Sequence, residues 1–144
     1  MTDYGVRLFD SAEAVERVGQ AFLEKTLPKE GWTHEAHLAT CLWIVRDRSE
    51  INPEGDIPRL ISSYNESLGG TNSDTEGYHE TITQVYIAAV RDHLDEAPDE
   101  PLIDSVNRLL LSDRGARDWP LRTYSRDRLF SVEARRGFVA PDLV

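Results

Sequence analysis

The spacing of apolar residues is the feature that most limits how this 144-residue chain can fold. Wherever a pattern is clear, apolar side chains recur three or four residues apart, which places them on one face of an α-helix. No segment alternates strictly between apolar and polar residues, so we expect no β-strand. The pattern therefore predicts an all-α fold.

Proline and glycine residues divide the helical pattern into five stretches, at 12–26, 34–48, 56–68, 77–96 and 101–114. Asp10 or Ser11 can cap the first and Thr33 the second, because their side-chain oxygens can accept from free backbone N–H groups. The last thirty residues are less regular, with Ser125 and Ser131 as candidate caps of short helical turns. We expect a single helical domain over residues 1–144, a compact bundle of about five helices with an irregular, arginine-rich C-terminal segment.

Two of these helices have informative faces. In the 34–48 stretch, Trp43 projects away from the face that carries Leu38 and Leu42, so this helix is expected to be buried on two sides. The 77–96 stretch has one broad face that we expect to be buried, formed by Tyr78, Ile82, Val85, Tyr86, Ala89, Val90 and His93.

The net charge of −10 excludes some functions. Binding to nucleic acid or to an anionic membrane needs a basic face, so neither is expected as a partner. The charge is uneven, since residues 114–144 contain seven arginines and only four acidic residues. We expect this arginine-rich segment to pack against the acidic remainder of the chain.

The compartment is indicated by three features of the sequence. Cys41 is the only cysteine, which excludes an intramolecular disulfide. No apolar stretch reaches the length needed to span a bilayer, and residues 1–5 lack the basic start and apolar core of a signal peptide. These features predict a cytoplasmic protein in a reducing environment.

Histidine spacing suggests a metal site. His34 and His37 lie about 60° apart on an ideal helix, with His34 on the core side and His37 at its edge, and His79 opens a later helix. Neutral imidazole is a good ligand for zinc and other divalent transition metals. His34, His37 and His79 are therefore candidate ligands of such a metal. The alternative is that these histidines are hydrogen-bonded core residues.

A carboxylate beside the histidines would complete an active site. His79 and Glu80 are the candidate catalytic residues, with Glu133 as another source of a carboxylate, and a bound metal could activate water for hydrolysis. This hypothesis describes a small metal-dependent, hydrolase-like enzyme. The competing hypothesis is a non-catalytic module that binds a small molecule or a protein, with exposed apolar surface around Trp32, Trp43 or Trp119 in the second case.

Three motifs occur together in this chain: GWTHEAHL at 31–38, GYHETIT at 77–83, and LFSVEARRG at 129–137 followed by PDL at 141–143. In this order they resemble a family of small bacterial proteins of uncharacterised activity. The resemblance spans residues 30–143 and supplies no reaction and no catalytic residue. It implies that both histidine motifs and the arginine-rich segment belong to one module.

Overall fold

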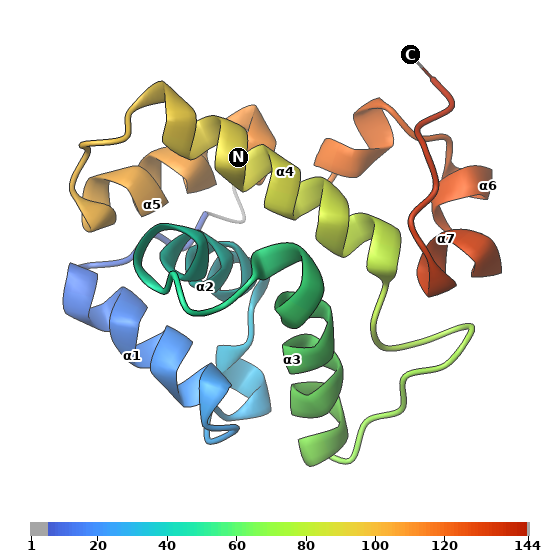
Figure 1. Cartoon of the computed structure of the whole chain (residues 1–144), viewed down its shortest axis with the longest axis horizontal. Helices are drawn as coiled ribbons and strands as arrows, with labels where there is room; N and C mark the ends of the chain where they lie inside the picture. Colours follow the sequence, from blue (N-terminus) through green and yellow to red (C-terminus); the bar gives the residue numbers. More distant parts are fainter. Residues whose placement is uncertain (1–5, 144) are drawn as a thin grey trace.

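The computed structural model describes residues 6–143, and every regular element in this part of the chain is helical (Figure 1). The all-α prediction is therefore confirmed. The α-helices are α1 (Ala12–Leu23), α2 (His34–Asp47), α3 (Pro53–Ser67), α4 (Glu80–Glu96), α5 (Leu102–Leu111), α6 (Arg126–Leu129) and α7 (Val132–Arg136). Short 3₁₀ turns lie at Lys29–Gly31, Asp113–Gly115 and Trp119–Arg122.

Residues 1–5, which bear on the expected absence of a signal peptide, lie outside the described residues. Among the helices of residues 6–143, none combines the length and the apolar character needed to cross a membrane.

Helix α2 is the central element of the bundle and packs against α1, α3, α4 and α5. Its buried residues surround the helix, with Leu38 and Leu42 in the main core and Trp43 against α1. This confirms that the helix is buried on two sides. Helix α4 runs across the molecule from α5 to the C-terminal helices α6 and α7 (Figure 1).

Side-chain caps explain where most helices begin. Ser11 accepts from Ala14 N at 3.1 Å, and Thr33 accepts from Ala36 N at the same distance. The predicted caps Ser125 and Ser131 also accept N–H groups at the starts of α6 and α7. The caps are worth about 1 kcal/mol each, since they satisfy donors that have no partner inside the helix.

Four helix ends differ from the prediction for local reasons, and one is the end of α5 at Leu111 instead of residue 114, where Ser112 is extended. Helix α1 ends at Leu23 because Lys25 takes a left-handed conformation with φ 62°. Helix α3 begins at Pro53, before the expected start near Asp56, because proline lacks an N–H and suits the first turn. Helix α4 begins at Glu80, since His79 is its extended N-cap residue.

Pro58 lies inside α3, where it cannot donate the usual hydrogen bond to the carbonyl oxygen four residues earlier. That oxygen belongs to Glu54, and Gln84 of α4 donates to it instead at 3.0 Å. The replacement bond lets α3 continue through the proline and ties it to α4.

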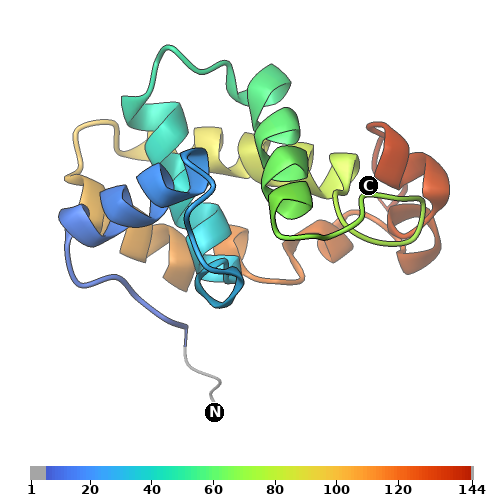
Figure 2. The ribbon, with the colours of Figure 1, turned by 90° about the horizontal axis from the view of Figure 1, so that it is seen from below.

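The arginine-rich C-terminal segment packs against the rest of the chain as expected. Arg136 pairs with Asp74 at 2.6 Å, and Arg135 donates to the carbonyl oxygen of Gly77 at 3.0 Å. Figure 2 shows the loop before α4 beside α6 and α7 at one end of the molecule. This segment therefore holds the start of α4 in place.

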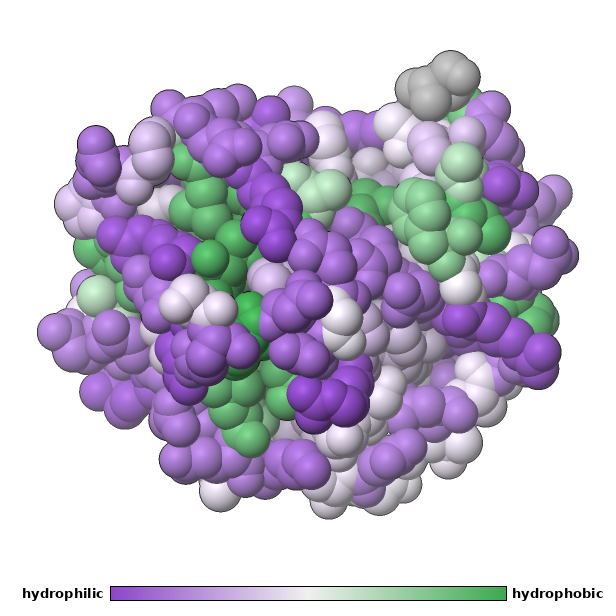
Figure 3. All heavy atoms as spheres, in the orientation of Figure 1, coloured by the Kyte–Doolittle hydropathy of each residue, from purple (hydrophilic) through white to green (hydrophobic). Residues whose placement is uncertain are grey.

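The face of the molecule seen in Figure 3 is mainly hydrophilic, with smaller apolar areas. The C-terminal segment contributes four exposed large apolar side chains, Phe130, Val132, Phe138 and Leu143. In contrast, Trp43 is buried, and Trp32 and Trp119 are partly buried. The exposed apolar side chains are thus not the tryptophans named by the interaction hypothesis.

Candidate functional site

A cavity of about 140 Å³ lies where α1, α2, α3 and α4 approach one another, beside the turn that precedes α2. Most of its wall is aliphatic or aromatic. No lining residue identified in residues 6–143 is an Asp, Glu, Lys or Arg. The wall also contains residues with polar side chains and one thiol: His34, His37, Thr40, Cys41, Thr83 and Tyr86.

His37 is held at this wall by a stack of aromatic rings. Its imidazole lies on the indole of Trp32, with ring centroids 3.9 Å apart and planes tilted by 30°. The Phe22 ring also stacks on the indole of Trp32, nearly parallel to it, with ring centroids 4.4 Å apart. Tyr64 packs against both Phe22 and Trp32 and donates to the carbonyl oxygen of Leu27 at 2.7 Å.

The His37 side chain has no hydrogen-bond partner among the described residues, whereas the three other histidine rings each contact a backbone carbonyl oxygen. Burial, together with the nearby His34, lowers the pKa of His37 to about 3. The ring is therefore neutral at physiological pH and offers one donor and one acceptor nitrogen.

Two further polar atoms belong to residues next to His37. The indole nitrogen of Trp32 and the hydroxyl oxygen of Thr40 are buried without a hydrogen-bond partner in residues 6–143. Trp32 stacks on His37, and Thr40 follows His37 by about one turn of α2. Both residues also line the cavity, so two side chains with unpartnered polar atoms flank His37 at its wall.

His34 also lines the cavity but has a structural partner. Its Nε2 atom lies 2.8 Å from the carbonyl oxygen of Gly115, and its ring meets the edge of Tyr86 with centroids 5.7 Å apart. Tyr86 in turn donates to the carbonyl oxygen of Ala116 at 2.6 Å. Burial lowers the pKa of His34, so this pair fixes the 115–116 turn to α2 and α4 without a charge.

Cys41 lines the cavity from α2. Burial raises the pKa of its thiol to about 12. The thiol is therefore protonated at neutral pH and acts as a small apolar group.

His79 and Glu80, the candidate catalytic pair, do not line the cavity. His79 Nδ1 accepts from Ile82 N at 3.2 Å, and Nε2 lies 2.7 Å from the carbonyl oxygen of Leu129. Burial lowers the pKa of His79, which is consistent with a neutral ring that donates from Nε2. Glu80 accepts from Tyr78 at 2.5 Å and from Gln84 at 3.1 Å.

The proposed metal ligands His34, His37 and His79 are only partly brought together. His34 and His37 share the cavity, as their helical spacing predicts, but His79 faces Leu129 instead. Residues 6–143 contain no group of three or more His, Cys, Asp or Glu side chains placed to hold a metal ion. Glu133 is exposed on α7. Metal binding and metal-dependent hydrolysis stay predictions that this geometry does not support.

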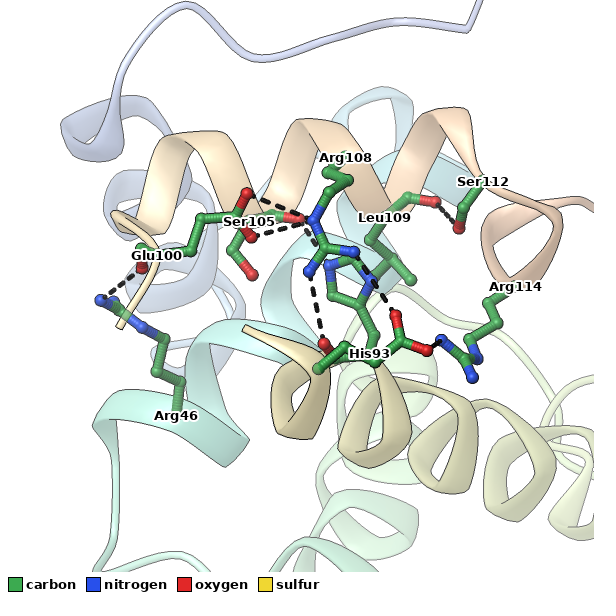
Figure 4. A network of polar contacts seen from close by, with 9 residues as sticks. Arg46, His93, Glu100, Ser105, Arg108, Leu109, Ser112 and Arg114 are labelled. Atoms are coloured by element: carbon green, nitrogen blue, oxygen red, sulfur yellow. Dashed lines mark hydrogen bonds and ion pairs between the residues drawn. The ribbon is translucent and has the colours of Figure 1, made fainter. Parts of the chain in front are cut away.

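His93 is a core residue, as its position on the buried face of α4 predicts. Its Nε2 atom lies 2.9 Å from the carbonyl oxygen of Ser105, and Figure 4 shows the surrounding polar network. Arg108 contacts the Glu100 carboxylate at 3.0 Å and the His93 carbonyl oxygen at 3.3 Å. Arg46 donates to the Glu100 carbonyl oxygen at 3.2 Å. The network joins the ends of α2, α4 and α5.

Sequence reasoning missed Trp32 and Thr40 as parts of the site. Trp32 lies in a turn, where helical periodicity carries no information about direction. Its position two residues before His34 is the only sequence signal that links it to the histidines.

No family model, curated protein or solved structure matches this chain in comparisons with known proteins. The resemblance to a bacterial family stays a prediction based on the three motifs.

Proposed function

We propose that this chain is a non-catalytic binding protein whose ligand is a small molecule held in the cavity beside His37. The observation that carries the proposal is the free imidazole. Three histidine rings contact backbone carbonyl oxygens, while the fourth faces an apolar cavity without a partner in the described residues. Binding sites commonly combine an apolar wall with a few polar groups that orient the ligand.

The cavity volume limits the ligand to a compact molecule. A cavity of about 150 Å³ lined by apolar side chains accommodates benzene in another protein, so about 140 Å³ suits a single ring. The mainly apolar wall favours a ligand with the same character, because its transfer from water is driven by the hydrophobic effect.

The lining residues favour binding over catalysis. Cys41 has a protonated thiol, and Thr83 donates its hydroxyl hydrogen to the carbonyl oxygen of His79 at 2.8 Å. No carboxylate lines the cavity among the described residues. A lone neutral imidazole is thus without an activated nucleophile or an acidic partner.

An NMR titration of the full chain with benzene, toluene and indole tests this proposal. We expect saturable shifts of backbone amide signals from α2, α3 and α4 next to the cavity. Cys41→Leu fills part of the cavity and should weaken binding, whereas Ala88→Leu adds the same side chain to the exposed face of α4 and should not. The absence of saturable shifts with all three compounds would contradict the proposal.

A further inference from the structure

We infer that the ligand of the cavity is a neutral, single-ring molecule that carries a hydroxyl group, as a phenol does. This inference rests on the proposed function and specifies the chemical class that the wall selects. It is carried by the position of His37 and by a wall to which residues 6–143 contribute no charged side chain.

Charge complementarity argues against an ionic ligand. Among the described residues, the cavity is lined by five isoleucines together with aromatic and imidazole rings, but by no Lys, Arg, Asp or Glu. An ionised ligand would lose its hydration in this cavity without meeting an opposite charge, which is strongly unfavourable.

A hydroxyl group matches the hydrogen-bonding capacity of His37. The neutral imidazole has one acceptor and one donor nitrogen, and a hydroxyl can donate to the first or accept from the second. The stack on Trp32 holds the imidazole with its centroid 3.9 Å from that of the indole, so the orientation of its nitrogens is set before a ligand arrives. Such preorganisation reduces the entropy cost of binding.

Two buried polar atoms without hydrogen-bond partners also favour a ligand with a hydroxyl group. Trp32 Nε1 and Thr40 Oγ1 are buried without partners in residues 6–143, and both belong to residues that line the cavity with His37. Buried polar atoms are nearly always hydrogen-bonded, so a small change in side-chain rotamer that engages a ligand oxygen would be favourable. A purely hydrocarbon ligand would leave all three groups unsatisfied.

The test compares dissociation constants of phenol, toluene and benzoate for the full chain at pH 7. Toluene has the same shape as phenol but no hydroxyl, and benzoate is charged. The measured quantity is the ratio of the toluene constant to the phenol constant. We expect this ratio to fall about tenfold in His37→Phe, which removes the hydrogen bond and keeps a ring, and benzoate to bind at least tenfold more weakly than phenol.

Matched variants separate this inference from the proposed function. Ala88→Leu lies on the exposed face of α4 outside the cavity and should leave the ratio unchanged. His37→Gln keeps a hydrogen-bond donor and an acceptor and should retain much of the wild-type ratio. Phenol should also shift the side-chain ¹⁵N signals of His37 in the wild-type chain, a readout that does not depend on the folding of a variant.

Each outcome has a distinct meaning. If toluene binds and the ratio is the same in wild type and His37→Phe, the hydroxyl inference is wrong while the binding function stands. Benzoate binding as tight as phenol would also overturn the inference. If none of the three compounds binds, the proposed function itself fails.

Discussion

The imidazole of His37 lies against the indole of Trp32, with centroids 3.9 Å apart, and this contact places a neutral base at the wall of an apolar cavity. Phe22 supports the other face of the indole at 4.4 Å. Aromatic stacks of this kind contribute about 0.5–1.5 kcal/mol beyond the area that they bury. The three rings therefore stabilise the turn before α2 and orient the side chain that we propose contacts the ligand.

Acid sensitivity follows from the lowered pKa of His37. The ring is neutral in the folded chain down to about pH 3, whereas in the unfolded chain it takes up a proton near pH 6.5. The unfolded state therefore binds more protons between these values, and stability falls as pH falls through this window. We expect His37 alone to lower the free energy of unfolding by about 1 kcal/mol from pH 6 to pH 5, measured by urea denaturation.

The variant His37→Phe provides the control, because phenylalanine does not titrate. Its free energy of unfolding should depend less steeply on pH between 6 and 5, by about the same 1 kcal/mol. A residual dependence is expected because burial also lowers the pKa values of His34, His79 and His93. An NMR titration that shows His37 protonated near pH 6 would contradict this prediction.

Two buried threonines should respond in opposite ways to valine. Thr40 has an unpartnered hydroxyl, so Thr40→Val should leave stability unchanged or raise it by about 1 kcal/mol. Thr81 donates to the Gly137 carbonyl oxygen at 3.0 Å and accepts from Val139 N at 3.1 Å. Thr81→Val should therefore cost about 1–3 kcal/mol by urea denaturation. Equal losses in the two variants would mean that the Thr40 hydroxyl has a partner.

The positions of the helices were largely predictable because their signals are local. Thr33, Ser125 and Ser131 each cap the helix predicted for them, and Ser11 is the one of two candidates that caps α1. The errors at helix ends arise where backbone conformation overrides side-chain pattern, as at Lys25 with its positive φ.

Gly19 should be intolerant of a side chain. A Cβ atom at this position would overlap the ring of Trp43, where α1 packs against the second buried side of α2. Although alanine favours helices, we expect Gly19→Ala to lose about 1–3 kcal/mol through overpacking, measured as a lower urea midpoint. Glu16→Ala on the exposed face of α1 is the control and should change stability by less than about 0.5 kcal/mol.

Gly77 and Gly69 form a matched pair in the loop before α4, with φ values of 85° and 83°. Alanine at either position would destabilise the fold by about 1–2 kcal/mol, because a residue with a Cβ is strained in the left-handed conformation. A Cβ at Gly77 would also overlap the carbonyl oxygen of Thr71, whereas nothing lies within 4 Å of one at Gly69. Gly77→Ala should therefore be the more destabilising by at least about 1 kcal/mol in thermal or urea denaturation. Equal losses would show that backbone conformation alone determines the cost.

The candidate site was predictable only in part. Helical phase correctly placed His34 and His37 on adjacent parts of one face, and both line the cavity. The same reasoning does not apply to His79, because it is an extended cap residue outside the helix whose ring contacts Leu129. Trp32 also lies outside any helical period, so its stack on His37 depends on tertiary packing that no local pattern encodes.

A crystal structure of the wild-type chain soaked with phenol is the most direct test of the central claim, that the cavity beside His37 is a binding site. The account predicts a single phenol ring in the cavity, with its hydroxyl oxygen within hydrogen-bond distance of a His37 ring nitrogen. A cavity that holds only water, or a phenol bound elsewhere on the molecule, would contradict the account.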